Sequence, residues 1–236
     1  MIAVLSESVP QAALQSIRTY GYEPILLPPH PSLPKAVASH PDMLLFLAQD
    51  VIFTEQNYYR IAKKELDALS VAAKKELRFV EEALSSAYPA DILFNALPMG
   101  EHLICNRKHT AKRILEDVSG EILDVHQGYC KCSSVPVSQN ALITADPSIA
   151  KKADAFGFDV LRIQEGFVSL PPYSTGFLGG ASSLAPYTDI DEIFFFGDLN
   201  FHPNKENILA FCAKYHKKAI SLCHTPLFDV GTAFLL

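Results

Sequence analysis

The sequence predicts an α/β fold in which a unit of the ββαβ type recurs about five times around a closed ring. Helical and extended segments follow one another in the order helix, strand, loop, strand, turn, strand, at a period of roughly forty to fifty residues. The strands come in hairpin-like pairs between helices, whereas a doubly wound sheet connects mostly single strands through helices. No G-x-G-x-x-G follows the first strand, which further disfavours a nucleotide-binding doubly wound sheet.

The first unit shows how the elements are assigned. A strand over residues 2–6 leads into a helix over residues 10–20, in which Ala13, Leu14 and Ile17 have the spacing of a buried helical face. Gly21 is typical of the position just after a helix. The other strands of this unit are expected over residues 22–27, 42–48 and 51–54.

The later units repeat this order. Helices are expected over residues 58–69, 71–77, 110–118, 147–157 and 203–215. Strands are expected over residues 121–126, 158–163, 166–170, 192–197, 218–222, 226–230 and 232–236, and hairpins over residues 88–105 and 128–146. Asp146 and Pro147 suit the cap and the first turn of the fourth helix. We expect a single domain, residues 1–236, with approximate repeats 1–54, 55–105, 106–146, 147–198 and 199–236.

Composition and charge limit the classes of partner. The 236 residues are 49% apolar and only 19% charged, which suits a compact protein and argues against disorder. The net charge of −6 disfavours nucleic acid or an anionic membrane as the main partner. The apolar runs are strand-sized, far short of the roughly twenty residues of a membrane span. Five cysteines are an odd number for a disulfide framework, and no secretion signal is found, so reduced thiols in the cytoplasm are expected.

The stretch from Gly128 to Asp146 carries the most chemical information. It combines a glycine-led bend, a Cys-x-Cys at Cys130 and Cys132, and two short apolar strands around a polar turn at residues 138–140. This pattern is typical of a β-hairpin with a thiol at its beginning. Because side chains alternate along a strand, Cys130 and Cys132 would share a face, so either thiol could be the reactive one.

Three short motifs lie far apart in the chain: His40-Pro41-Asp42, Cys132-Ser133-Ser134 about two repeats later, and Phe228-Asp229-Val230-Gly231 in the last unit. Together with the ring of units, they resemble the pentein superfamily, the five-bladed α/β propellers of guanidino-group-modifying enzymes. These enzymes include arginine deiminases, dimethylarginine dimethylaminohydrolases and amidinotransferases. The chain also looks like an uncharacterised bacterial family of this fold.

The order of the motifs implies a circular permutation. In the enzymes a Gly-Gly-Asp-Val element stands one unit before the His-x-Asp, and here the similar residues around Asp229 stand in the last unit. Going backwards around a closed ring from the first unit leads to the last one. A ring with adjacent termini tolerates such a permutation well.

The resemblance implies a Cys-dependent hydrolase of the deiminase or amidinohydrolase type, acting on a guanidine or amidine compound. Cys132 would attack the amidine carbon as a thiolate. His40 would lower the pKa of the thiol, protonate the leaving amine and activate water, and Asp42 would orient the imidazole. The substrate-binding residues would be Asp229, Asn95, Gly179 and Gly180. The expected partner is a small cationic guanidine-like molecule, with no metal and no other cofactor.

Each of these residues also has a structural interpretation. Cys132 could be packed in the core, as cysteines commonly are. His40-Pro41-Asp42 could be a turn that begins a strand, much as His202-Pro203-Asn204 is expected to open the fifth helix. Asp229 could cap a turn, and Gly179-Gly180 could form a tight loop. The alternative function is therefore a non-catalytic propeller that binds a small ligand or a protein partner.

The sequence departs from the enzyme motifs in three places. Asp229 lacks the preceding Glu-Gly-Gly, Gly179-Gly180 are followed by Ala-Ser, and Pro41 replaces the usual apolar residue of the His-x-Asp. These departures bear on guanidinium binding more than on the fold. A zinc site is a further alternative, with irregularly spaced candidate ligands at His102, Cys105, His126, Cys130 and Cys132.

Overall fold

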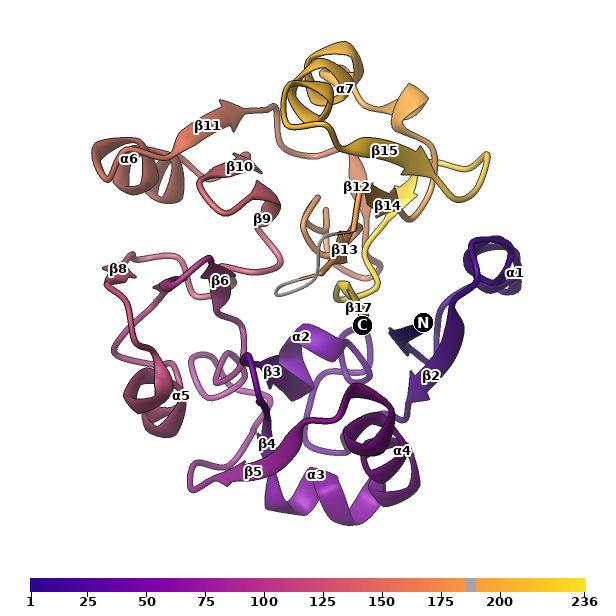
Figure 1. Cartoon of the computed structure of the whole chain (residues 1–236). Helices are drawn as coiled ribbons and strands as arrows, with labels where there is room; N and C mark the ends of the chain where they lie inside the picture. The colour runs from indigo at the N-terminus through magenta and orange to yellow at the C-terminus, as the bar shows by residue number, and fades with distance from the viewer. Residues whose placement is uncertain (186–189) are drawn as a thin grey trace.

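Short mixed sheets recur along the chain in the computed structural model, which describes residues 1–185 and 190–236. In a complete unit the first two strands pair antiparallel and the last two pair parallel. A helix connects the two parallel strands, because a parallel pair needs a long crossover connection. Figure 1 shows the units arranged around a common centre, with the longer helices toward the outside.

Three units are formed by consecutive sequence. The first contains β3 (Leu45–Leu47), β4 (Val51–Glu55) and β5 (Glu76–Val80), with α3 (Gln56–Ile61) and α4 (Lys63–Ala73) before β5. The second contains β6 (Leu97–Met99), β7 (His102–Cys105), α5 (Lys112–Asp117) and β8 (Ile122–Asp124). The third contains β9 (Ser134–Ser138), β10 (Ala141–Thr144), α6 (Pro147–Ala155) and β11 (Asp159–Arg162).

The other sheets join distant parts of the chain. β14 (Glu192–Phe195) pairs parallel with β15 (Lys218–Ser221), and η1 (Leu199–Phe201) and α7 (Lys205–Lys214) connect them. β12 (Val168–Ser169) pairs with β16 (Leu227–Phe228). The last sheet has the order β13 (Ser183–Leu184), β17 (Ala233–Leu235), β1 (Ile2–Ser6), β2 (Glu23–Leu27), with α1 (Gln11–Thr19) between β1 and β2. The antiparallel pairing of β17 with β1 brings both ends of the chain into one sheet (Figure 1).

Burial increases from the outer strand of a unit to its inner strand. Every residue of β3, β6 and β17 is buried, whereas β2, β11 and β15 are mostly half-buried or exposed. Apolar side chains of the inner and middle strands form the core clusters. Polar groups that the chain carries to the centre are therefore removed from water and must find partners there.

Two predicted elements differ from the structure. The strand predicted over residues 42–48 begins only at Leu45, because residues 41–44 form the short helix α2 (Pro41–Leu44), and Pro41 suits a first helical position. The helix predicted over residues 71–77 ends at Ala73, and Lys74 is left-handed at φ 54°. The residues that follow form β5, since pairing with β4 outweighs the helical preference of their Glu, Leu and Arg side chains.

Several sequence features do have the expected structure. Asp146 caps α6 by accepting hydrogen bonds from the backbone N–H groups of Ser148 and Ile149. β9 and β10 form the hairpin expected after Cys132.

β4 pairs with β5 across the predicted division at residue 54, so this unit extends beyond that division. In the described part of the chain, every helix is too short or too polar to span a membrane.

Candidate functional site

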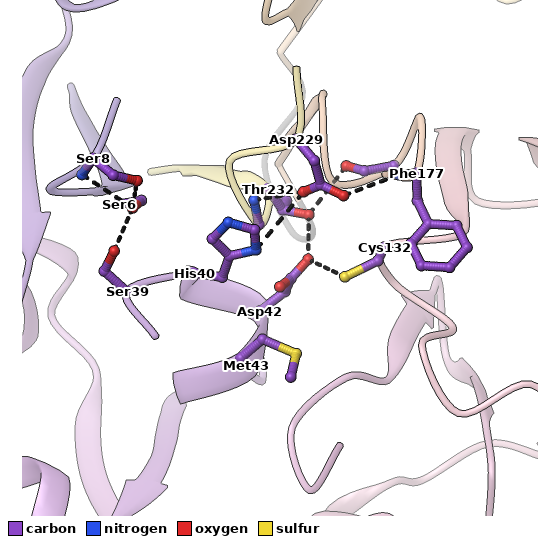
Figure 2. A network of polar contacts seen from close by, with 12 residues as sticks. Ser6, Ser8, Ser39, His40, Asp42, Met43, Cys132, Phe177, Asp229 and Thr232 are labelled. Atoms are coloured by element: carbon purple, nitrogen blue, oxygen red, sulfur yellow. Dashed lines mark hydrogen bonds and ion pairs between the residues drawn. The ribbon is translucent and has the colours of Figure 1, made fainter. Parts of the chain in front are cut away.

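Residues that precede the inner strands of different units meet at the centre of the molecule. The predicted site residues are brought together there: His40 and Asp42 before β3, Asn95 before β6, Cys132 before β9, Gly179 and Gly180 before β13, and Asp229 before β17. Figure 2 shows two neighbouring groups of polar contacts, His40 with Asp229, and Asp42 with Cys132 and Thr232. The repeated unit explains this convergence, because each unit presents the same strand end to the centre.

The thiol of Cys132 lies between an amide and a carboxylate. Its Sγ is 2.9 Å from Nδ2 of Asn95 and 3.0 Å from Oδ2 of Asp42. The same Asp42 oxygen accepts a hydrogen bond of 2.8 Å from the hydroxyl of Thr232. The other Asp42 oxygen, Oδ1, is buried and has no hydrogen-bond partner in the part of the chain that the structure describes. The Asp42 carboxylate therefore retains an unused acceptor in the middle of the protein.

Asp229 is held by backbone groups and lies beside His40. Its Oδ2 accepts from Phe177 N–H and its Oδ1 from Gly231 N–H, each at 2.9 Å. The Nδ1 atom of His40 is 3.8 Å from Oδ1, an ion-pair distance but too long for a hydrogen bond. Burial raises the pKa of Asp229, and nearby Asp42 adds to this, while His40 and the backbone donors oppose it. Asp229, predicted as a ligand for substrate, is thus also the carboxylate in contact with the imidazole.

Two glycines allow the backbone to approach these side chains closely. A Cβ atom at Gly180 would lie 2.1 Å from Oδ1 of Asp229, and one at Gly231 would lie 2.0 Å from Cβ of His40. Gly231 also has a φ of +70°, which L-residues with a side chain rarely adopt. Glycine at these positions is therefore required for His40 and Asp229 to lie where they do.

Asn95 supports the loop that carries the thiol. Its Oδ1 accepts hydrogen bonds from the backbone N–H groups of Lys131 (2.9 Å) and Cys132 (3.2 Å), while its Nδ2 donates toward Cys132 Sγ. Both ends of the amide are thus used by residues 131–132. We had expected Asn95 to bind substrate, and its contacts give it a positioning role in this state of the site.

The thiol is buried, and its surroundings favour the protonated form. Only 4% of Cys132 is exposed. Burial raises the pKa of Cys132 well above its ordinary value, and the neighbouring carboxylates of Asp42 and Asp229 raise it further. Beside Asp42, the gap lined by Lys131 and apolar side chains has no room for a water molecule among the described residues. The thiol is therefore shielded from solvent in this structure.

Two residues of this site were not expected from the sequence. Lys131 is 1% exposed and donates hydrogen bonds of 3.2 Å to the backbone carbonyls of Ser134 and Gly179. Burial lowers the pKa of Lys131 to about 8, against the opposing effect of Asp42, Cys132 and Asp229. The signal was a lysine between two cysteines at the start of a buried hairpin, where a surface charge is out of place.

Thr232 is the second unexpected residue. It is a β-branched residue with a φ of +66°, a conformation that costs energy and needs support from its surroundings. That support comes from its backbone N–H, which donates to Gly180 O at 2.9 Å, and from its hydroxyl, which contacts Asp42. The strained backbone thus directs a hydroxyl at the carboxylate beside Cys132.

Cys130 does not share the environment of Cys132. It lies in a turn rather than a strand, its Sγ is 3.0 Å from Gln127 O, and it packs in an apolar cluster with Leu97 and Leu142. The expected shared face is therefore wrong, because residues 129–132 are not extended. Within residues 1–185 and 190–236, no three His, Cys, Asp or Glu side chains form a group that could hold a metal ion.

Comparison with solved structures identifies the fold. A cysteine-to-serine mutant of dimethylarginine dimethylaminohydrolase from Pseudomonas aeruginosa, complexed with citrulline, matches with a TM-score of 0.56, 11% identity, and coverage of 93% of this chain and 91% of that chain. A dimethylarginine dimethylaminohydrolase adduct with 4-chloro-2-hydroxymethylpyridine matches with a TM-score of 0.55, 11% identity and the same coverage. These proteins belong to the pentein superfamily, so the predicted resemblance to penteins is confirmed at the level of the fold.

A longer protein with this fold is also similar. The arginine dihydrolase ArgZ, from the ornithine–ammonia cycle in cyanobacteria, matches with a TM-score of 0.55 and 10% identity over 93% of this chain and 36% of its own length. No curated protein sequence matches the chain significantly. A family model described as a family of unknown function, DUF6873, matches residues 4–234.

Proposed function

Because the chain belongs to the family of unknown function DUF6873 and has the pentein fold, we propose that it is a Cys-dependent hydrolase of a guanidine or amidine group. The observation that supports this most is the meeting of a thiol, an imidazole and two carboxylates, contributed by three parts of the chain, at one buried point. The structurally similar arginine dihydrolase and dimethylarginine dimethylaminohydrolase carry names that refer to guanidino compounds.

We propose, further, that the units form a closed five-bladed propeller within a single domain. The pairing of β17 with β1 supports closure, because it builds one sheet from the two ends of the chain. The position of the Asp229 segment in this last sheet supports a circular permutation relative to the guanidino-modifying enzymes. A permuted variant with its ends joined by a short linker and new termini in the β9–β10 turn should fold, and failure to fold would argue against closure.

The substrate proposed is a small cation. Asp42 Oδ1 is a buried carboxylate oxygen with no partner among the described residues, and leaving such an acceptor unpaired costs free energy. A guanidinium group carries several N–H donors in a plane and pairs well with carboxylates. Binding of this group at Asp42 would satisfy the free oxygen, and Asp229 would add to the attraction.

The arrangement around Asp42 suits attack on a bound guanidinium. Figure 2 shows the His40 ring and the Cys132 thiol on opposite sides of the Asp42 carboxylate. A guanidinium held by Asp42 would therefore have a nucleophile on one side and a proton donor on the other. The added positive charge would also offset the two carboxylates that raise the pKa of Cys132, and so favour the thiolate.

The reaction would proceed in two steps. First, Cys132 gives its thiol proton to His40, and Sγ bonds to the central carbon. The C–N bond to one nitrogen then breaks, and that nitrogen leaves as an amine or ammonia after taking this proton from His40. Water then adds to the same carbon while His40 removes its proton. The C–S bond breaks, which returns the thiol and releases a urea or ureido product.

A non-catalytic ligand-binding protein is the second candidate function. The burial of Cys132 and its raised pKa favour it, because both oppose a reactive thiolate in the unliganded state. In that case Asp42 and Asp229 would hold a cation without formation of a covalent bond. The two candidates share the ligand class and differ in turnover.

The test compares two cysteines two residues apart. We would measure release of ammonia or amine from arginine, N-methylated arginines and agmatine by the wild-type protein and by the Cys132→Ala and Cys130→Ala variants. The hydrolase predicts turnover that is abolished in Cys132→Ala and retained in Cys130→Ala, since Cys130 lies outside the site. Thermal stabilisation by these compounds without turnover would instead support the binding protein. Turnover that is unchanged in Cys132→Ala would exclude the proposed mechanism.

A further inference from the structure

Lys131 is a buried cation that the proposed reaction does not use. We propose that it is an internal counter-cation, which limits the centre to ligands that bring a single positive charge. This inference rests on the proposed function only in taking the ligand to be a cation. It assigns to Lys131 a role in specificity rather than in the chemical steps.

The hydrogen bonds of Lys131 fix its ammonium group inside the protein. Nζ donates to the carbonyl oxygens of Ser134, the first residue of β9, and of Gly179, in the segment before β13, both at 3.2 Å. Both acceptors are neutral, so they solvate the ammonium group without cancelling its charge. The buried charge therefore depends on carboxylates elsewhere in the centre for compensation.

The compensating carboxylates are those that would bind the ligand. Asp42 and Asp229 both act on Lys131 electrostatically, and both favour its charged form. With both carboxylates ionised, the pair carries two negative charges, and Lys131 supplies one positive charge. These three groups therefore leave one negative charge uncompensated, and one guanidinium group or one imidazolium at His40 can neutralise it.

The surroundings make this balance strict. Lys131 shares a gap with Asp42, and the rest of its lining is apolar, including Phe94, Leu184 and Phe234. This gap has no room for water in the described structure, so solvent does not screen the charges there. Under these conditions an excess of one charge is costly, and the number of fixed charges determines which ligands bind.

The experiment removes the charge of Lys131 and measures binding of methylguanidinium, which stays a monocation at all the pH values used. Affinity is measured by calorimetry in the Cys132→Ala background, where no reaction can occur. We expect Lys131→Met to bind the probe roughly tenfold more tightly than the lysine form, because one repulsive charge has been removed. The matched control is Lys151→Met, which changes an exposed lysine on α6 and should leave the affinity unchanged.

A pH series separates the charge of Lys131 from its packing. In the lysine form, affinity should rise between pH 7 and 9, since the pKa of Lys131 is about 8 and its positive charge is lost over this range. The facing groups Asp42, Asp229 and His40 are the same in both forms, so the advantage of Lys131→Met over the lysine form should shrink as pH rises. Lys131→Gln serves in place of Lys131→Met if the latter does not fold.

Equal or weaker binding by the neutral variants, or an advantage that does not change with pH, would overturn the role of Lys131. Absence of methylguanidinium binding in every variant would also overturn this role, because removing the charge of Lys131 would then not have made Asp42 and Asp229 available to a cation. Turnover by the wild-type protein together with equal affinities would reject only this inference. Tighter binding by Lys131→Met without turnover in any form with Cys132 would reject only the hydrolase.

Discussion

Among the described residues, two buried contacts join a histidine to a carboxylate, and they differ in how completely their polar atoms are hydrogen-bonded. In the first, His30 Nε2 lies 2.8 Å from Glu55 Oε2, and His30 Nδ1 accepts the backbone N–H of Ser32 at 3.0 Å. The second oxygen of Glu55 accepts from the backbone N–H of Leu84 and the side chain of Asn57, each at 3.3 Å. Every polar atom of this pair is therefore used.

The second contact lies in the centre and is looser. His40 Nδ1 and Asp229 Oδ1 are 3.8 Å apart, and neighbouring Asp42 has an oxygen without a partner among the described residues. Proteins rarely leave buried polar groups unpaired without a functional reason. The comparison teaches that the His30 pair ties a loop to the core, whereas the group around His40 keeps an acceptor that the described residues do not satisfy.

The largest expected effect is on the satisfied pair. Glu55→Ala should lower the free energy of unfolding by about 3–5 kcal/mol, because it leaves His30 and the backbone N–H of Leu84 without an acceptor in the core. Chemical denaturation measures this loss. His40→Ala should cost clearly less, since its contact with Asp229 is long. Equal losses in the two variants would mean that the looser contact is also mainly structural.

A smaller loss of stability is expected when a methyl group is placed against Asp229. Gly180→Ala places a methyl group where Asp229 Oδ1 lies, so the carboxylate must move and stability should fall by about 1–3 kcal/mol. Gly157→Ala is the matched control, because nothing lies within 4 Å of its Cβ and only backbone strain is added. If Asp229 takes part in the site, Gly180→Ala should also abolish methylguanidinium binding, while Gly157→Ala retains it.

Asp42, whose Oδ1 has no partner among the described residues, should contribute little to the stability of the fold. Asp42→Asn keeps an acceptor for Thr232 and removes one negative charge beside Asp229, so we expect a change in unfolding free energy within about 1 kcal/mol. Ligand affinity should nevertheless fall by roughly a hundredfold, because a charged hydrogen-bond acceptor is lost. A loss of stability as large as that of Glu55→Ala would show that Asp42 belongs to the fold rather than to a site.

The sequence was informative about the fold where local signals agree with the tertiary structure. Asp146 predicts the start of α6, and the pattern after Cys132 predicts the β9–β10 hairpin. It failed at β5, because only pairing with β4 makes residues 76–80 a strand. A parallel pairing across a helical crossover leaves no local trace in the sequence.

The candidate site was predictable in part. The resemblance to penteins pointed to His40, Cys132 and Asp229, which lie far apart in the chain and meet in the structure. The sequence contains only a weak signal for the burial of Lys131 and none for the strained backbone of Thr232, since both depend on how distant segments pack around one centre. We expected Asp42 to orient His40, whereas Asp229 lies beside the imidazole and Asp42 contacts Cys132. The spacing of the motifs does not determine which carboxylate contacts the imidazole.

The smallest expected effect concerns pH and compares two carboxylates with opposite shifts. Partial burial alone would raise the pKa of Asp146, but hydrogen bonds from Ile149, Ser148 and Gln127 bring it below its ordinary value. Its contribution to stability is therefore present above the unfolded pKa of 3.8 and is lost as pH falls through the lower, folded pKa.

Asp229 should show the reverse dependence. Burial raises its pKa, so the folded protein binds this proton more readily than the unfolded chain does. Any stability linked to protonation of Asp229 is fully present below the unfolded pKa of 3.8 and is lost as pH rises through the folded pKa.

Urea denaturation from pH 3 to 7 of the wild-type protein, Asp146→Asn and Asp229→Asn measures both pH dependences. The stability difference from wild type should increase with pH for Asp146→Asn and decrease with pH for Asp229→Asn. Slopes of the same sign would mean that the folded protein stabilises Asp229 as a carboxylate, and the opposite pKa shifts of the two groups would be wrong.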